Sequence, residues 1–157
     1  MENTLTTNRN ALTPIEATPL EMRMDAQRFP RLATISREDA ITQMIDVVRA
    51  AAIYRNAKMD AQEIAVTAAA LVDELNADTR LGLKFISFAE IRRAVRTAVL
   101  ETEMYGVNVA SLYRAIVAYA KGEGTQATKA AQMQQSRTSA PQVAIDAAAA
   151  ALIKNNR

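Results

Sequence analysis

Three arginines lie close together in the second half of the chain, and their side chains suit the recognition of phosphate. Arg92, Arg93 and Arg96 fall on one face of a helix at 100° per residue. Guanidinium groups neutralise the phosphates of a polyanion such as DNA. Arg80 and Lys84 precede them and would extend the same charged surface. The alternative is an ordinary solvated face that attracts the acidic first half of the chain.

A second candidate site is the stretch MYGVNVASLYRAI, which runs from Met104 to Ile116. Its glycine permits a turn, and Asn108 is a suitable N-cap for the helix that follows. The segment resembles the turn and recognition helix of helix-turn-helix proteins, in which the second helix enters the major groove. That resemblance implies that Asn108, Ser111 and Arg114 contact bases or phosphates. The alternative is an antiparallel helix hairpin with a glycine corner.

The residues offer little for catalysis. The chain has no histidine and no cysteine, which excludes zinc fingers, nucleophiles activated by histidine and most transition-metal sites. Glu101 and Glu103 would point to different faces of a helix, and Asp73 and Glu74 are typical of a solvated helix end. Neither GxxxxGK[ST] nor GxGxxG occurs. We therefore predict a protein that is not an enzyme and has no metal or cofactor.

The elements that must position these residues are helices. Aromatic residues make up only 4% of the chain, so its core must come from Ile, Leu, Val, Met and Ala. Four segments have apolar residues at helical spacing, and each is preceded by a capping residue. These caps are Ser36, Asp60, Ser87 and Asn108. We predict an all-α fold, a small bundle of four core helices in two hairpins that spans residues 37–121.

The two ends of the chain have different patterns. Residues 1–36 mix Thr, Asn, Pro and charge, which predicts a flexible arm with at most a short helical turn around 19–28. Residues 122–139 are polar and of low complexity, which predicts a linker that begins where Gly122 and Gly124 stop the fourth helix. Residues 140–157 are rich in alanine and predict a last helix. Such a helix is marginal alone and could support a homo-oligomer.

Charge is unevenly distributed between the two predicted hairpins. Residues 37–79 carry four basic and eight acidic side chains, whereas residues 80–121 carry seven basic and three acidic ones. Such asymmetry is typical of some nucleic-acid-binding faces. No apolar stretch approaches the roughly 20 residues that cross a bilayer, and the polar N-terminus has no signal-peptide pattern. We therefore expect no membrane contact and a cytoplasmic location in a bacterial host cell.

A wider resemblance covers Phe88 to Gly124. The segment FAEIRRAVRTAVLETEMYGVNVASLYRAIVAYAKGEG resembles the C-terminal part of small helical proteins encoded by phages and mobile elements of Bacteroidetes, near replication genes. The shared features are an acid-Ile helix start, a basic helix and a tyrosine-glycine corner. Here the corner is Glu103-Met104-Tyr105-Gly106, and the family's tryptophan is absent. The resemblance implies an accessory role in DNA replication or its regulation.

Two functions remain open at this point. The first is a DNA-associated accessory protein of a phage or mobile element. The second is a protein–protein interaction or structural module, such as a phage virion component, whose partners are replication or virion proteins and which contacts no nucleic acid. The first requires Arg92, Arg93, Arg96 and Arg114 to share an exposed surface. If Arg92, Arg93 and Arg96 face the acidic helices instead, the protein-interaction or structural module is favoured.

Overall fold

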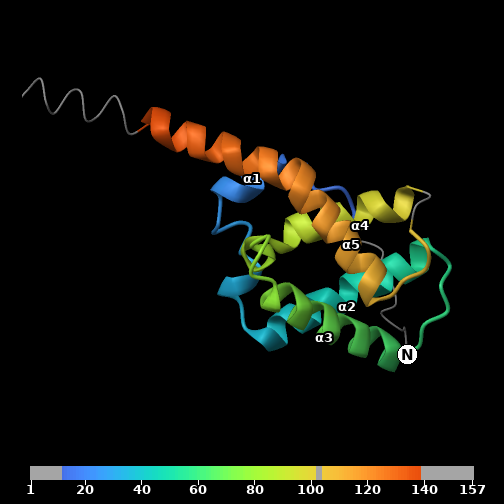
Figure 1. The fold of residues 1–157 in the computed structure, drawn as a ribbon. Coiled ribbons are helices and arrows are strands. Elements are labelled where there is room, and N and C mark those ends of the chain that lie inside the picture. The colour runs from blue at the N-terminus through green and yellow to red at the C-terminus, as the bar shows by residue number, and fades with distance from the viewer. Residues whose placement is uncertain (1–11, 102–103, 139–157) are drawn as a thin grey trace, which may run out of the picture.

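The fold is all-α, as the periodicity predicts. The computed structural model describes residues 12–101 and 104–138, and within these ranges it contains helices and loops with a single isolated β-bridge, between Arg31 and Ser87 (Figure 1). No helix of this part of the chain has the length and apolar character that crossing a membrane requires. The main helices are α1 (Pro19–Met24), α2 (Arg37–Tyr54), α3 (Ala61–Ala77), α4 (Phe88–Leu100) and α5 (Val109–Tyr119).

The four predicted capping residues begin helices α2, α3, α4 and α5. The side chains of Ser36, Asp60, Ser87 and Asn108 each accept the backbone N–H three residues later. At Asp60, Ser87 and Asn108 the third residue also bonds back to the cap, which completes a capping box. These bonds satisfy N–H groups that a helix start otherwise leaves unpaired, so each boundary is fixed locally.

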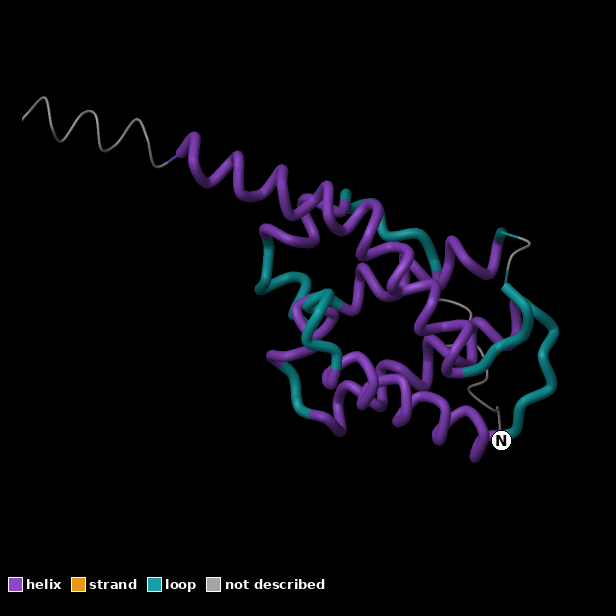
Figure 2. The backbone as a smooth tube through the Cα atoms, viewed as in Figure 1, coloured by secondary structure: helices purple, strands orange, loops and turns teal. Residues whose placement is uncertain are grey.

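The helices form two hairpins that pack on each other. In sequence order α2 pairs with α3 and α4 with α5; α2 also packs on α4, and α3 on α5. The backbone tube in Figure 2 shows this arrangement of helices joined by loops. Fully buried side chains from all four helices meet in one core, to which Met44, Leu71, Ile91 and Ile116 contribute. Burial of such aliphatic side chains stabilises the fold by roughly 1.5–3 kcal/mol each.

The N-terminal segment corrects one prediction. We expected a flexible arm over residues 1–36, yet residues 12–36 pack against the bundle, and residues 1–11 lie outside the described part. Leu12 and Leu32 join the main core, and Met22 and Phe29 form a second cluster with Ala89 of α4. These apolar residues are spaced too irregularly to form a periodic pattern in the sequence, but packing against the bundle buries their side chains.

The region after α5 differs from a second prediction. Residues 122–139 were predicted to be a linker, but the chain stays helical as far as residue 138, and the predicted helix 140–157 lies outside the described residues. Ala120–Gly124 forms one π-helical turn instead of stopping the helix. A π turn inserts one extra residue and keeps the backbone hydrogen bonded, so Gly122 and Gly124 do not end α5. Residues 125–138 then project beyond the bundle past α1 (Figure 1).

Candidate functional site

The three α4 arginines lie around a single small hollow. Arg92, Arg93 and Arg96 line it together with residues of the N-terminal segment. The hollow has a volume of about 140 Å³, and we call it the arginine hollow. Its other lining residues are Thr13, Pro14, Ile15, Met22 and Thr97. The structure thus brings together the arginines that helical periodicity placed on one face.

Each arginine of the hollow has a different environment. Arg93 Nε donates to Glu123 Oε2 at 2.6 Å, and this hydrogen bond raises the pKa of Arg93 above its ordinary value. Arg96 Nη1 donates to the Leu12 carbonyl at 3.0 Å. Arg92 differs, because its Nε is buried and has no hydrogen-bond partner among the described residues. All three side chains are half-buried and less open than a solvated face would be.

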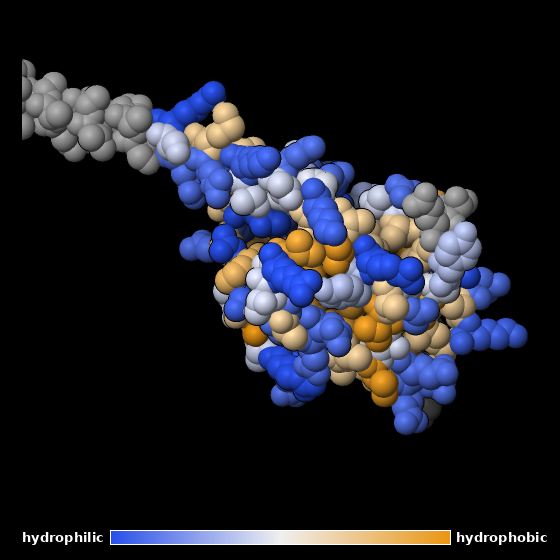
Figure 3. All heavy atoms as spheres, in the orientation of Figure 1, coloured by the Kyte–Doolittle hydropathy of each residue, from blue (hydrophilic) through white to orange (hydrophobic). Residues whose placement is uncertain are grey.

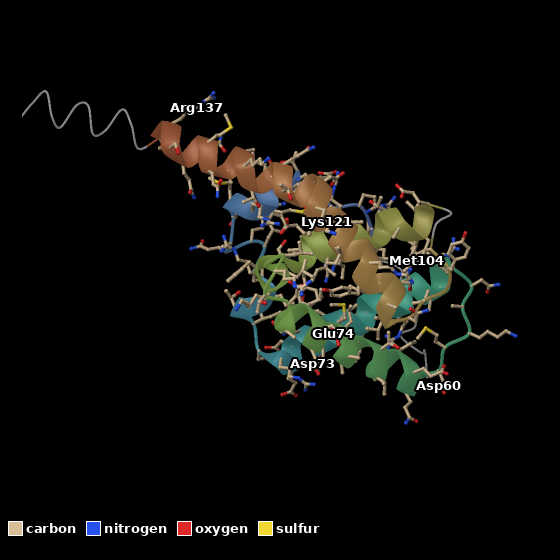
Figure 4. The ribbon with its side chains drawn as sticks, viewed as in Figure 1. Asp60, Asp73, Glu74, Met104, Lys121 and Arg137 are labelled. Atoms are coloured by element: carbon tan, nitrogen blue, oxygen red, sulfur yellow. The ribbon has the colours of Figure 1, made fainter. Side chains whose placement is uncertain are left out.

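The contacts of the triplet lead away from the acidic hairpin. Arg93 and Arg96 contact the helix after α5 and the N-terminal segment, and the hollow has no lining residue from α2 or α3. Figure 4 shows the acidic residues Asp60, Asp73 and Glu74 around α3, away from Lys121 in the π turn and from Arg137 on the projecting helix of residues 125–138. Asp73 is paired with Arg37 of the same hairpin at 2.8 Å. The basic side chains of α4 are therefore not held by attraction to α2 and α3.

Arg114 borders a different depression, which lies between α4 and α5. This groove has a volume of about 470 Å³ and a floor of small residues, including Ala98 and Ala115. Thr97 lines both the groove and the arginine hollow, so the two are neighbours. Further lining residues of the groove are Glu101, Met104, Tyr105, Arg114, Tyr119 and Glu123. The four arginines thus border adjoining depressions.

The predicted base-contacting residues are mostly used within the protein. Ser111 is only 7% exposed, and its hydroxyl donates to the Gly106 and Asn108 carbonyls and accepts the Asn108 N–H. Asn108 is exposed, but its Oδ1 caps α5 by accepting the Ser111 N–H at 2.9 Å. Arg114 is exposed, and within the described part of the chain only its Nε is hydrogen bonded, to the Ala110 carbonyl. Ser111 is therefore structural rather than a base contact.

The corner itself departs from a helix-turn-helix. Between the end of α4 and the start of α5 the chain runs from Glu101 to Asn108, which is longer than the three or four residues of that motif. Gly106 has a positive φ of 77°, as expected of a glycine in a turn. The stretch is a hairpin corner, which was the alternative interpretation. Glu103, the first residue of the corner in the resemblance, lies outside the described residues.

Arg80 and Lys84 lie in the loop between α3 and α4, and neither lines the arginine hollow. Arg80 is exposed, and its backbone N–H donates to Asp78 Oδ1. Lys84 Nζ lies 5.2 Å from the centre of the Phe85 ring, a cation–π distance. These two cations therefore do not extend the hollow as the sequence suggested.

Sequence reasoning missed a buried polar network beside the site. Glu90 is fully buried, and its carboxylate accepts from Arg23 Nε at 2.7 Å and from the Tyr119 hydroxyl at 3.0 Å. Arg23 also donates to Thr128 on the projecting helix. Burial, reinforced by the charge of Glu90, raises the pKa of Tyr119. The SFAE capping box identified Glu90 as a helix start, but only the packed structure gives it these distant partners.

The described residues hold no group of three or more acidic, His or Cys side chains placed to bind a metal ion. The class that the fold defines is a small all-α helical bundle. No protein-family model, curated protein or solved structure matches the chain. Function must therefore be inferred from the residues themselves.

Proposed function

We propose that this chain is a non-enzymatic DNA-associated accessory protein that contacts phosphates through the arginines of α4. The observation that carries the proposal is the grouping of Arg92, Arg93 and Arg96 around one hollow, away from the acidic hairpin. Phosphate contacts by arginine supply most of the sequence-independent affinity of DNA-binding proteins. Arg114, exposed on the adjoining groove, adds a fourth cation.

The resemblance of Phe88–Gly124 to small phage and mobile-element proteins near replication genes supports a role in replication or its regulation. Two of the three predicted base-contacting residues serve the fold, since Ser111 is buried and Asn108 Oδ1 caps α5. We therefore propose that binding depends on charge and on the form of the DNA rather than on contacts to base edges.

The test is fluorescence anisotropy with labelled duplex and single-stranded DNA over a series of salt concentrations. Binding through three or four phosphates predicts a log–log slope of about −3 for duplex DNA, from roughly −0.9 for each phosphate. Replacement of Arg92, Arg93 and Arg96 by glutamine should abolish most of the binding.

The matched control replaces Arg37, Arg49 and Lys58 by glutamine, which removes the same charge from α2 and the loop after it. This variant should bind as the wild type does, because these residues do not line the arginine hollow. Circular dichroism must show that both triple variants remain helical. Equal loss of binding in the two variants, or no binding by the wild type at low salt, would contradict the proposal.

The α4–α5 groove favours a second candidate function, a protein-interaction module. Its small-residue floor can accept the side chains of an apolar helix, and Tyr105 beside it is 89% exposed. Figure 3 shows apolar atoms across the body of the bundle among charged side chains, whereas the projecting helix is mostly hydrophilic. Exposed aromatic residues are common in interfaces.

The first partner to test for this groove is a second copy of the chain. Sedimentation velocity should compare the wild type with Ala98→Trp, which would fill the groove. An oligomer in the wild type that the substitution dissociates supports the module. If both sediment as monomers, self-association through the groove is excluded.

A further inference from the structure

We propose that the arginine hollow is a binding site for one phosphate group, and that its DNA ligand is a terminal phosphate rather than the continuous backbone. This inference rests on the proposed function and sharpens it. Inorganic phosphate and the 5′-phosphate of an oligonucleotide share the chemistry that the hollow would recognise, so both serve as probes.

The charge of the lining is the first argument. Three of the residues around the hollow are arginines, and no carboxylate lines it. Its remaining walls include the apolar side chains of Pro14, Ile15 and Met22. Apolar walls exclude water and strengthen attraction between a bound anion and nearby cations. A compact oxyanion is the ligand that this combination of charge and surroundings favours.

The unpaired nitrogen of Arg92 is the second argument. Its Nε is buried yet has no hydrogen-bond partner among the described residues. Buried polar atoms are almost always hydrogen bonded, so an exception requires an explanation. Arg92 also lines the hollow, but its Nε has almost no exposed surface, so an anion in the hollow reaches this donor only after the side chain turns. A bound anion would thus draw the Arg92 guanidinium toward the hollow and satisfy a donor that the protein alone leaves unmet.

The third argument is that the neighbouring arginines are already held in place. Glu123 fixes Arg93 through Nε and Nη2, and the Leu12 carbonyl fixes Arg96 through Nη1. A guanidinium has five N–H donors, so each of these side chains retains donors for a ligand. Thr13 and Thr97 add hydroxyl groups to the lining. Cations restrained in this way lose little conformational entropy when they bind an anion.

Size selects the form of the phosphate. The hollow, at about 140 Å³, is small beside the roughly 300–1,000 Å³ of sites for drug-sized ligands. A single tetrahedral group can enter it, but a nucleoside cannot. A terminal monoester carries chain on one side only and can be inserted end-on. An internal phosphodiester carries chain on both sides, so we expect it to reach only the rim.

Isothermal titration calorimetry of the full chain with inorganic phosphate tests the site, with sodium chloride at matched ionic strength as the reference. We expect phosphate to bind at one site per chain and chloride to give no signal. Arg92→Gln should weaken phosphate binding at least tenfold, whereas the matched control Arg37→Gln should not change it. Arg37 is an exposed arginine of α2 that is paired with Asp73.

A second variant tests the phosphate site even if Arg92→Gln fails to fold. Thr97 is exposed and lines the hollow, so Thr97→Asp introduces a negative charge at its edge without disturbing the core. This variant should also lose phosphate binding, whereas Thr79→Asp, which adds the same charge at an exposed threonine that does not line the hollow, should retain it. Equal phosphate affinity in Thr97→Asp and Thr79→Asp would overturn the inference.

Two oligonucleotides of one sequence, with a 5′-phosphate or a 5′-hydroxyl, separate this inference from the proposed function. Tighter binding of the 5′-phosphorylated strand, with inorganic phosphate as a competitor, is the expected result. DNA binding that is indifferent to the terminal phosphate would overturn the inference and leave the proposed function standing. Binding of inorganic phosphate without any binding of DNA would support the anion site while refuting both its DNA ligand and the proposed function.

Discussion

Arg23 Nε lies 2.7 Å from Glu90 Oε1, and this ion pair joins the N-terminal segment to α4 across 67 positions of sequence. The Glu90 side chain is fully buried and that of Arg23 is 17% exposed. The same carboxylate accepts from the Ser87 backbone N–H and hydroxyl and from the Tyr119 hydroxyl. One carboxylate therefore connects α1, α4 and α5, on which both depressions of the candidate site depend.

Glu90→Gln should destabilise the protein strongly. The substitution keeps the size of the side chain but removes the charge that compensates the guanidinium of Arg23. Loss of one partner of a buried ion pair costs about 3–5 kcal/mol. Urea denaturation should show this loss, and Glu101→Gln, an exposed change just after the same helix, should lie within about 0.5 kcal/mol of the wild type. A similarly small effect of Glu90→Gln would mean that the pair does not hold α1 to the bundle.

Tyr113→Phe should reduce stability in a manner that depends on pH. The Tyr113 hydroxyl donates to Asp78 Oδ2 at 2.6 Å. The Leu81 backbone N–H and then this hydroxyl lower the pKa of Asp78, and the same hydrogen bond raises the pKa of Tyr113. At pH 7 the substitution should cost about 1 kcal/mol.

The direction in which stability changes with pH follows from the pKa shifts of Asp78 and Tyr113. The contribution of Asp78 is complete above its unfolded pKa of about 3.9 and is lost as pH falls through the lower folded value. The contribution of Tyr113 is complete below about pH 10 and is lost as pH rises through its folded pKa. Urea titrations of Tyr113→Phe and wild type should therefore differ most near pH 7 and converge at both extremes. A difference that stays constant with pH would assign the loss to packing instead.

Gly122 and Gly124 should respond oppositely to alanine. A Cβ at Gly122 would meet nothing within 4 Å, and alanine there should stabilise the helix by up to about 1 kcal/mol. A Cβ at Gly124 would lie 3.3 Å from the Tyr119 carbonyl oxygen and 3.4 Å from Arg23 Nη2. Gly124→Ala should therefore lack that gain or destabilise the protein. Thermal denaturation should therefore show a higher melting temperature for Gly122→Ala than for Gly124→Ala. Identical changes in melting temperature would show that Arg23 does not approach the helix this closely.

Gly106→Ala should destabilise the corner between α4 and α5. The glycine has a φ of 77°, a region that costs other residues about 1–2 kcal/mol. Chemical denaturation should show a loss of that size, and Gly122→Ala is the control for an effect of glycine replacement in general. A neutral or stabilising result would indicate that the corner has another backbone conformation.

Features that depend only on residues close together in the chain could be predicted from the sequence. Each capping bond joins residues three apart, so Ser36, Asp60, Ser87 and Asn108 could be recognised from the chain alone. The periodicity also placed Arg92, Arg93 and Arg96 on one face correctly. Both predictions require only helix geometry.

Features that depend on distant segments could not be predicted in this way. Leu12 is fully buried and its carbonyl accepts from Arg96, yet the surrounding residues look like an unstructured arm. The burial of Ser111 follows from how the corner folds back on α5 rather than from any local pattern. The hollow itself exists only because the N-terminal segment covers one edge of α4.

The π turn at Ala120–Gly124 fixes the rotation of residues 125–138 about their helix axis. Because the wider turn takes up one extra residue, these residues are turned by about 100° relative to the same sequence in an uninterrupted α-helix. With that rotation Ala127 is buried and Thr128 meets Arg23. The face of residues 125–138 that meets α1 therefore depends on this one wide turn: with the same residues in an ordinary α-helical turn, Ala127 and Thr128 would be rotated away from α1.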